Sequence, residues 1–473
     1  MARSFAFAVL LVLATTQALR ASNITVGPNV NITRALGNQA ESTISVNPLN
    51  PLQLFESDTL SGVGHFSTNG GATWATSNLS ALGTSLGDVQ TAWDQFGNLF
   101  LTRFGNPSPS TSISVARSTD GGATFGDVRT ISGVSGNDQP SIAVGANSVW
   151  VDFTNPSGQI VAAGAQVSGF NSVGAFSPLQ VAPGTGGATP GDFGDIAIGP
   201  TGQVAVVYQN NASGAGPDTI KFNLDPNGLG AGGFNSQSTV TATNVGGFHP
   251  VPAQPNRTID AEANLAWDHS GGPHNGRLYM VYTDTPSLSS PNATNIFVRF
   301  SDDNGTTWSA PVKVNDDNTS NSHILPAIAV DQTTGDVAVT WYDARNSVNN
   351  NTLQIFGAVT DNGGLSFGSN FQISAGTIDC RVDGLFDCGD YDKMTFSDGE
   401  FWRTWADDSN STLDNPNGTA ALDIYTAEVT VSAVSAAEPS TILLLPFGLI
   451  VVVIVLARGK QEDKLTPSDP SAA

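Results

Sequence analysis

Five residues that can take part in acid–base or polar chemistry stand at one register relative to short apolar motifs. Each lies three residues before such a motif: Glu41, Asp88, Gln139, Glu262 and Tyr391. Carboxylates accept protons and hydrogen bonds, and a tyrosine hydroxyl donates, accepts or, when activated, attacks as a nucleophile. If the fold brings these positions together, they form an acidic site that favours neutral or cationic ligands over anions.

The apolar motifs that follow these residues recur seven times. Each is a short strand with a small middle residue, and the copies start at Ile44, Thr91, Ile142, Ile196, Leu265, Ile328 and Met394. A second apolar run follows each motif and ends at Asp58, Asn106, Asn155, Asn210, Asp284, Asp343 or Asp407. Seven such pairs predict an all-β chain folded as a seven-bladed β-propeller of four-stranded antiparallel blades, with six blades as the alternative. The small middle residues are expected where the innermost strands crowd the axis.

The ends of the propeller must meet to close its ring. The seventh repeat runs from Asp390 to about Val431 and has room for three strands only. The segment Asn23 to Thr33 precedes the first repeat and has the pattern of a loose strand. We therefore expect this segment to supply the outer strand of the last blade.

A polar turn ending in an aromatic residue occurs late in four of the repeats. In each copy, Ser or Thr is followed by Asp or Asn two positions later, then by glycine and by Trp or Phe. Glycine adopts positive φ and the Asp or Asn accepts bonds from turn amides, so a turn between the third and fourth strands is expected. The residues are Ser67, Asn69 and Trp74; Ser118, Asp120 and Phe125; Ser301, Asp303 and Trp308; and Thr360, Asn362 and Phe367.

These turns resemble the Asp-box, or BNR repeat, of the sialidase superfamily. The resemblance implies the propeller fold, with the boxes on the face away from the active site. In that topology, the starts of first strands and the ends of second strands meet on the opposite face. This places Asp343 and Asp407 near the entrance, with His323, Arg345 and Arg257 beside it.

The resemblance also implies catalytic roles, although its arginines are incomplete. "DYDKMTFSDG" is similar to the stretch that carries the sialidase nucleophile, which implies Tyr391 as nucleophile, Glu262 as its base and Asp88 as acid. Arg257 and Arg345 would bind a substrate carboxylate, with His323, Asp343 and Asp407 as further contacts. However, the family's arginine positions hold Ile324 and Asp284 here. Without the full set of arginines, an acidic mouth binds a carboxylate poorly.

Several of these residues also have purely structural interpretations. Strand-end aspartates commonly hold turns, and Tyr391 is equally consistent with a packed, hydrogen-bonded tyrosine. The segment "DDNTSN" from Asp316 has oxygen ligands for calcium but lacks the glycine and final glutamate of an EF-hand. No cofactor and no other metal site is predicted. Two functions remain: a noncatalytic module that binds a glycan or an extracellular protein, and a sialidase-type glycoside hydrolase.

Both ends of the chain have hydrophobic segments typical of export. Residues 1–21 have the pattern of a signal peptide, which leaves residues 22–432 for the propeller. Residues 433–441 form a tether, 442–457 an apolar helix followed by basic residues, and 458–473 a polar tail. With "EPST" before it, this segment partly resembles the bacterial PEP-CTERM sorting tail. We expect an exported protein on the cell surface or periplasmic side, anchored by one C-terminal segment.

Composition and cysteine content agree with this location. The formal net charge is −23, which argues against nucleic acid as a partner because its phosphates would be repelled. Cys380 and Cys388 are the only two cysteines, and in an exported protein they are expected to form a local disulfide. The ligand itself, the oligomeric state and cleavage of the C-terminal segment are not determined by the sequence.

Overall fold

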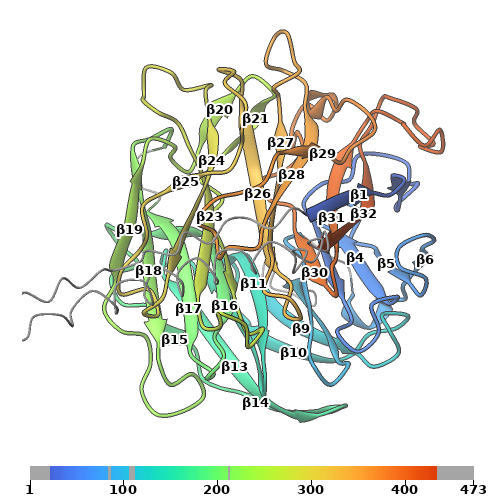
Figure 1. The fold of residues 1–473 in the computed structure, drawn as a ribbon. Helices are drawn as coiled ribbons and strands as arrows, with labels where there is room; N and C mark the ends of the chain where they lie inside the picture. The colour runs from blue at the N-terminus through green and yellow to red at the C-terminus, as the bar shows by residue number, and fades with distance from the viewer. Residues whose placement is uncertain (1–21, 84–86, 106–111, 211–213, 434–473) are drawn as a thin grey trace, which may run out of the picture. The chain divides into compact units, whose positions relative to one another are not determined.

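The computed structural model describes residues 22–433 except 84–86, 106–111 and 211–213. Within these residues the chain forms seven antiparallel β-sheets of four or more strands and one separate hairpin (Figure 1). This confirms the predicted seven-bladed propeller. The signal peptide, the apolar helix at 442–457 and the polar tail lie outside the described residues and stay predictions. Among the residues that are described, no helix has the length and apolar character needed to cross a membrane.

The first three blades each contain consecutive strands numbered from the axis outward. Blade 1 contains β3 (Ser42–Val46), β4 (Leu54–Asp58), β5 (Gly64–Ser67) and β6 (Ala75–Thr76). Blade 2 contains β7 (Gln90–Trp93), β8 (Leu99–Gly105), β9 (Ser112–Ser118) and β10 (Gly126–Ser132). Blade 3 contains β11 (Asp138–Gly145), β12 (Ser148–Thr154), β13 (Ile160–Gly169) and β14 (Ser172–Phe176), with the short β15 (Gln180–Val181) beside β13.

The next three blades repeat this order. Blade 4 contains β16 (Gly191–Ile198), β17 (Val204–Asn210), β18 (Asp218–Asp225) and β19 (Ser238–Thr243). After the hairpin β20 (His249–Val251) and β21 (Gln254–Ile259), blade 5 contains β22 (Asn264–Trp267), β23 (Leu278–Asp284), β24 (Asn295–Ser301) and β25 (Val312–Lys313). Blade 6 contains β26 (His323–Val330), β27 (Val337–Asp343), β28 (Gln354–Thr360) and β29 (Phe371–Gln372). The described helical turns are the 3₁₀ turns Ser80–Leu82 and Cys380–Val382.

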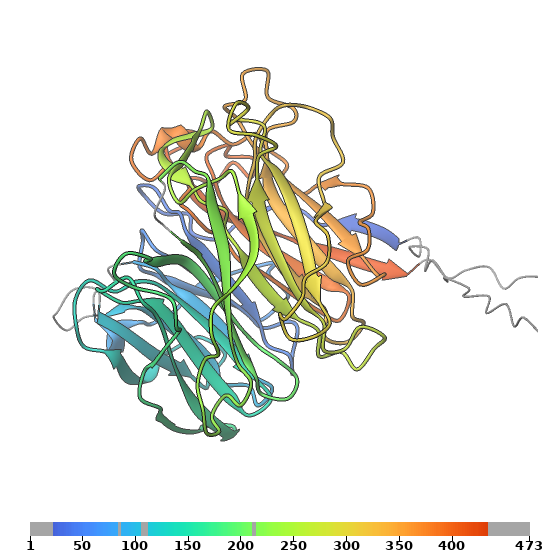
Figure 2. The same ribbon diagram turned by 90° about the vertical axis from the view of Figure 1, so that its left-hand side faces the viewer.

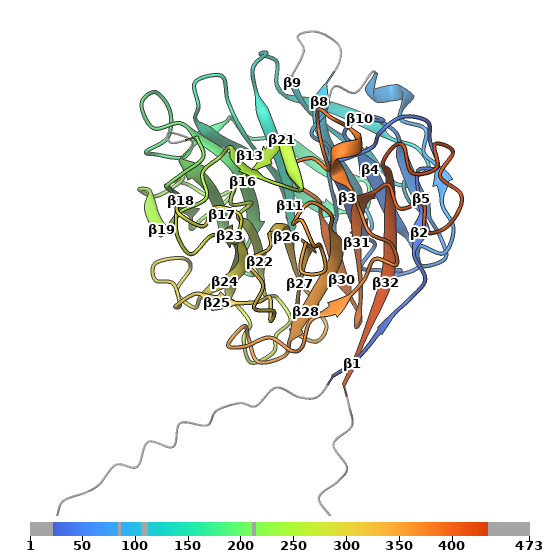
Figure 3. The same ribbon diagram turned by 90° about the horizontal axis from the view of Figure 1, so that it is seen from above.

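Blade 7 is built from both ends of the propeller. It contains β30 (Met394–Ser397), β31 (Glu400–Asp407) and β32 (Asp423–Ala433), and its outer strand is β1 (Ser22–Val26). The short β2 (Val30–Asn31) also pairs with β32. Figures 2 and 3 show the N-terminal strand, in blue, beside the C-terminal strand, in red. The predicted ring closure by residues 23–33 is therefore confirmed.

The second strands explain why the sequence shows apolar runs rather than alternation. Every residue of β12 and β27 is buried, because neighbouring blades cover both faces of each sheet. The innermost strands gather toward the middle of the ring, where β11, β16, β26 and β30 are seen in Figure 3. They surround an axial channel of about 560 Å³.

The small middle residues of the inner strands do not line this channel, contrary to the prediction. The channel is lined instead by the first residue of each motif, such as Ile142, Ile196 and Ile328. Side chains alternate along a strand, so the middle residue points toward a neighbouring blade. Ala197 belongs to the same buried cluster as Leu265 of the next blade. The small side chain therefore permits close packing between blades rather than around the axis.

Candidate functional site

The backbone has the same unusual conformation at the start of six inner strands. The residue three positions before each motif has φ between 44° and 58°, a left-handed conformation that is uncommon without glycine. In blades 3, 4 and 6 a register shift of the β-ladder includes this residue, and such bulges redirect side chains. The repeated bulge therefore sets the direction of the entrance side chains, which are Glu41, Asp88, Gln139, Phe193, Glu262 and Leu325.

Two adjoining pockets open at this end of the propeller, which we call the mouth. The axial pocket has a volume of about 330 Å³, and its lining includes Gln139, Phe193, Glu262, Tyr391 and Lys393. It shares Lys393 with the axial channel beyond it. Glu262 and Tyr391, predicted from separate repeats, thus line one pocket.

The second pocket, which we call the aspartate pocket, shares Gln139 and Phe193 with the first. Its volume is about 470 Å³, and four aspartates, one arginine and an exposed aromatic ring contribute to its wall. Phe248 is 52% exposed and packs edge-on against Phe193, with ring centroids 5.7 Å apart. The charged residues of the wall are Asp138, Asp192, Asp260, Asp390 and Arg257.

The hairpin β20–β21 carries Phe248 and Arg257 to the mouth. His249 holds the hairpin, since its Nδ1 and Nε2 each lie 2.8 Å from a carbonyl oxygen, of Ala215 and Pro291. The loop before blade 7 supports the other side and contains the expected disulfide Cys380–Cys388. In that loop, the Asp387 carboxylate accepts hydrogen bonds from the backbone N–H of Arg257 (3.0 Å) and of its neighbour in the chain.

Arg257 is the positive centre of a cluster of carboxyl groups. Its guanidinium forms ion pairs with Asp390 and, at 3.3 Å, with Glu41. Burial raises the pKa of Glu41 well above its usual range, and Asp390 and Asp88 raise it further. Burial likewise raises the pKa of Asp88, with Asp138 and Asp390 adding to the effect. Burial thus favours the protonated forms of these two carboxyl groups, and Arg257 is already paired.

Tyr391 lies in this cluster as a neutral, buried phenol. It is 6% exposed, and its hydroxyl lies 2.9 Å from the Thr59 hydroxyl. Burial raises the pKa of Tyr391 well above its usual range, and the nearby Asp88 and Glu41 raise it further. These surroundings oppose formation of a phenolate. The carboxyl groups that act on Tyr391 include Asp88, Glu41 and Asp390, whereas Glu262 interacts with Asn264 and Lys393.

Glu262 and Lys393 form a second group of ionisable side chains in the mouth. The Glu262 carboxylate accepts a hydrogen bond from the Asn264 side chain at 2.9 Å, and Lys393 donates to the same amide through its oxygen at 2.5 Å. Burial raises the pKa of Glu262 to about 8, although Lys393 and the bond from Asn264 oppose the shift. Lys393 also lies 3.6 Å from Asp195. Glu262 therefore retains a proton at neutral pH.

This shift makes folding stability depend on pH. The folded-state pKa of Glu262 is about 8 and its ordinary value is 4.5, so over this interval the unfolded chain releases a proton that the folded chain keeps. The free energy of unfolding should therefore fall as pH rises from about 5 to 8, by roughly 1 kcal/mol per pH unit. Glu262→Gln should reduce this slope in urea titrations, whereas Glu428→Gln on β32, the third strand of blade 7, should not. An unchanged slope in Glu262→Gln would contradict the assignment.

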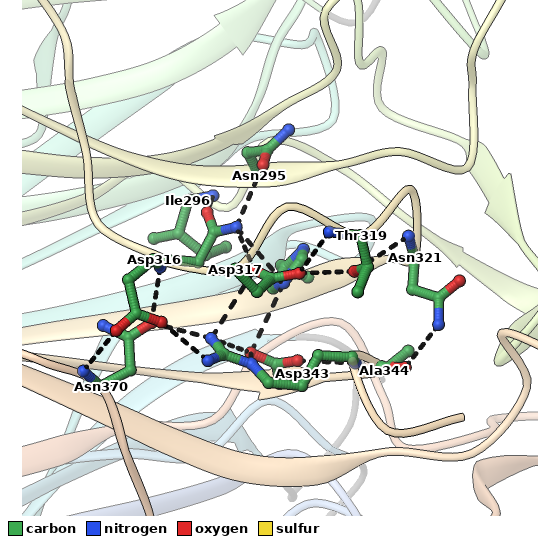
Figure 4. Close-up of polar contacts among 12 residues, drawn as sticks. Asn295, Ile296, Asp316, Asp317, Thr319, Asn321, Asp343, Ala344 and Asn370 are labelled. Atoms are coloured by element: carbon green, nitrogen blue, oxygen red, sulfur yellow. Dashed lines mark hydrogen bonds and ion pairs between the residues drawn. The ribbon is translucent and has the colours of Figure 1, made fainter. Parts of the chain in front are cut away.

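Arg345 and His323 both contact Asp343, and none of the three lines either pocket of the mouth. Figure 4 shows Asp316, Asp317 and Asp343 of this network. The Arg345 guanidinium donates to Asp343 at 2.8 Å and to Asp316 at 2.9 Å, and it lies over the Phe356 ring. His323 is fully buried and contacts Asp317 at 2.9 Å. This network is internally satisfied, so it offers no free guanidinium to a substrate carboxylate.

The same network includes the segment considered for calcium. Asp316 and Asp317 direct their carboxylates to Arg345 and His323 rather than to a shared point. Across residues 22–433, leaving out the three undescribed loops, no group of three or more His, Cys, Asp or Glu side chains has an arrangement suited to a metal ion.

The strand-end aspartates hold turns and neighbouring side chains. Asp407 is fully buried and accepts from the Trp405 indole at 2.9 Å and the Ser409 amide at 2.6 Å. Asp58 accepts from the Ser61 amide at 2.7 Å. Asp407, predicted as a substrate contact, thus has its bonds inside blade 7.

The Asp-box turns lie between the third and fourth strands of blades 1, 2, 5 and 6. In blade 5, Ser301 donates to Asp303 at 2.8 Å, and Asp303 accepts from the Thr307 amide at 2.8 Å. The box aromatics pack against the preceding blade: Trp308 lies edge-on to Phe222 of blade 4. The boxes therefore join neighbouring blades, which explains why each turn ends in a large aromatic residue. Phe125 contacts Phe55 of blade 1 in the same way.

Several residues of the mouth were not among the predicted site residues. An aspartate stands directly before the entrance position in blades 3, 4 and 7, a repeat visible in the sequence: Asp138, Asp192 and Asp390. Phe193 occupies the entrance position of blade 4, where an apolar residue gives no sign of polar chemistry. Asp260, Phe248 and Lys393 have no comparable signal, since their places depend on the hairpin and on the axial packing.

Comparisons with known proteins give distant similarities only. No protein-family model and no curated protein matches the chain. Similar solved structures include a protein of unknown function from Dyadobacter fermentans DSM 18053, with 11% identity over 86% of this chain and 99% of that chain and a TM-score of 0.45. An α-L-arabinofuranosidase from Fusarium graminearum has 12% identity over 85% and 97% of the two chains, with a TM-score of 0.45. The endosialidase of phage phi92 has 10% identity over 88% and 70%, with a TM-score of 0.46. Similarity at this level concerns the fold and does not extend to the chemistry of a site.

Proposed function

We propose that the protein is a noncatalytic glycan-binding propeller whose ligand occupies the mouth. The observation that carries this proposal is an exposed aromatic ring beside buried carboxyl groups. Phe248 is 52% exposed at the wall of a pocket that four aspartates also line. An aromatic face packs against the C–H groups of a sugar ring, and carboxylates accept hydrogen bonds from sugar hydroxyls.

The electrostatics of the mouth argue against sialic acid as this ligand. Arg257 is the arginine in the wall of the aspartate pocket, and it is already paired with Asp390 and Glu41. A sialic acid carboxylate would approach a wall that is otherwise acidic. Tyr391, the expected nucleophile, is a buried phenol whose pKa is raised by burial and by Asp88 and Glu41.

A glycan array and a sialoside assay test this function together. The purified protein should bind a defined set of neutral or amine-bearing glycans and should release no sialic acid from fluorogenic sialosides. Phe248→Ala should weaken glycan binding about tenfold, while Phe170→Ala should not, since Phe170 is an equally exposed ring (57%) at the end of the third strand of blade 3. An empty array, or sialic acid release that Tyr391→Phe abolishes, would overturn the proposal.

A glycoside hydrolase is the second candidate because of Glu262. This carboxyl group lines the axial pocket and has a pKa of about 8, raised by burial, so it carries the proton that a general acid must donate. Turnover of neutral chromogenic glycosides that is lost in Glu262→Gln would favour this function over simple binding.

A further inference from the structure

We propose that the aspartate pocket recognises the protonated amine of an amino sugar, so that the glycan bound at the mouth contains a hexosamine with a free amino group. This inference rests on the proposed glycan-binding function and names the chemical class of its ligand. It is carried by unpartnered buried oxygens, by the charge balance of the pocket and by the position of Phe248.

Two carboxylate oxygens of the pocket have no hydrogen-bond donor among the described residues. They are Oδ2 of Asp260, a residue only 1% exposed, and Oδ1 of Asp390, a residue 6% exposed. A buried acceptor without a donor carries a free-energy cost. A ligand that brings N–H donors to these oxygens removes that cost. An ammonium group has three such donors and a positive charge.

The charge of the pocket also calls for a cation. Four aspartates line it, and Arg257 is the one basic residue in its wall. The Arg257 guanidinium is directed to Asp390 and Glu41, which leaves the Asp260 side of the pocket without a basic partner. Within the described part of the chain, the hydrogen bond to the Asp260 side chain comes from the backbone N–H of Glu262, on its other oxygen. A cationic ligand therefore meets uncompensated negative charge, whereas a neutral sugar would leave it in place.

The aromatic ring selects a sugar rather than a bare ion or a flexible amine. Phe193 fixes the Phe248 ring by edge-on packing at 78°, so a flat apolar surface stands at the edge of the pocket. A pyranose ring can cover this surface while its amino group reaches the carboxylates, and an ammonium near an aromatic face gains a cation–π attraction. A metal ion would not cover the Phe248 ring and has no N–H donors for the carboxylates.

Binding of an ammonium should also displace protons from the pocket. Burial raises the pKa of Asp260 well above its usual range, and Glu262, Asp390 and Asp192, which face it, raise it further. A bound ammonium favours the ionised form of this carboxyl group and so lowers its pKa. Proton release on binding would be detected as a dependence of the calorimetric enthalpy on the ionisation enthalpy of the buffer.

The test compares two probes that differ only in the amine. The purified protein is titrated with a β1,4-linked glucosamine tetramer and with the corresponding N-acetylglucosamine tetramer, near pH 7, at low and high salt. Acetylation removes the charge and two of the donors. We expect the amine form to bind at least tenfold more tightly, with an affinity that falls as salt rises.

Matched variants locate the contact. Asp260→Asn keeps the shape of the side chain and should lower affinity for the amine tetramer about tenfold without weakening the acetylated one. Asp302→Asn changes an exposed aspartate paired with Arg277 and should have no effect. Circular dichroism and melting temperature show whether either variant has folded.

The outcomes separate this inference from the function on which it rests. Equal binding of the two tetramers, or tighter binding of the acetylated one, overturns the amine assignment and leaves a glycan-binding mouth. If neither tetramer binds while neutral glycans bind on the array, the amine assignment is likewise overturned and the glycan-binding function remains. Binding of a lysine-rich peptide with no sugar bound at all overturns both proposals.

Discussion

Deletion of residues 22–35 is expected to destabilise the propeller by about 5 kcal/mol or more, which approaches the whole stability of many domains. The segment provides the outer strand of blade 7 and several further bonds to β32. Gly27 N donates to Glu428 O and Ile32 N to Ile424 O, both at 2.8 Å. Ile32 is 4% exposed and lies in the largest buried cluster. Removing it exposes apolar surface and leaves a bare strand edge prone to association.

Thermal and urea unfolding of the truncated protein measure this effect. A peptide of residues 22–35 added to the truncated protein should restore part of the lost stability, because the edge of β32 remains available for pairing. Two point variants provide a matched comparison. Ile32→Asp should be strongly destabilising, whereas Leu36→Asp, at a residue that is 80% exposed, should be nearly neutral. A truncated protein with the melting temperature of the intact one would show that the ring closes without this strand.

The second large effect is expected at Asp392, the residue after Tyr391. Its fully buried carboxylate accepts from the Ser42 amide at 2.9 Å, the Ser42 hydroxyl at 2.5 Å and the Tyr342 hydroxyl at 2.6 Å. It thereby links blade 7 to blades 1 and 6. Burial raises the pKa of Asp392 to about 6, against the effect of Arg403 and of these hydrogen bonds, so the group is ionised at pH 7.5.

Arg403 makes the loss of Asp392 more costly. Its guanidinium is fully buried, donates to Leu325 O at 2.9 Å and lies over the Tyr342 ring. Burial lowers the pKa of Arg403, and the charge of Asp392 opposes this shift most strongly. Asp392→Ala would remove that compensation, and loss of the charge that stabilises a buried ion costs about 3–5 kcal/mol. Urea unfolding at pH 7.5 measures the loss.

A double variant and a surface pair provide the controls for this prediction. Asp392→Ala combined with Arg403→Met should be more stable than Asp392→Ala alone, because the double variant lacks the buried charge of Arg403. Asp414→Ala, which breaks the exposed pair with Arg34, should cost less than about 1 kcal/mol. If Asp392→Ala cost no more than Asp414→Ala, the network would not have the role assigned to it.

The number of blades and the closure of the ring were predictable because they depend on local periodicity. Each inner motif, each apolar second strand and each Asp-box turn leaves a repeated pattern, and the seventh repeat is visibly one strand short. The shared position of the entrance residues, three residues before each inner motif, was equally visible in the sequence. It depends on a constant distance from each inner motif, so Glu41, Asp88, Glu262 and Tyr391 could be placed at one end of the propeller from spacing alone.

The composition of the site was decided by tertiary contacts between segments far apart in the sequence. Arg345 and Arg257 look alike as isolated arginines, yet Arg345 is closed into a network with Asp343 and Asp316, while Arg257 reaches the mouth. Spacing cannot tell these apart, because the difference depends on which carboxylates lie within ion-pair distance.

In the aspartate pocket, too, some residues could be predicted from a sequence pattern and others only from the tertiary structure. The aspartates before the entrance positions of blades 3, 4 and 7 leave a sequence pattern, but Phe248 and Asp260 reach the pocket only through the hairpin β20–β21. That hairpin is held by His249 and by the disulfide loop, through contacts between residues up to 131 positions apart. The sequence by itself determined the ring of blades and its acidic end. The tertiary structure decided which charges remain unpaired there, because only the packing of distant loops sets burial and the partner of each carboxylate.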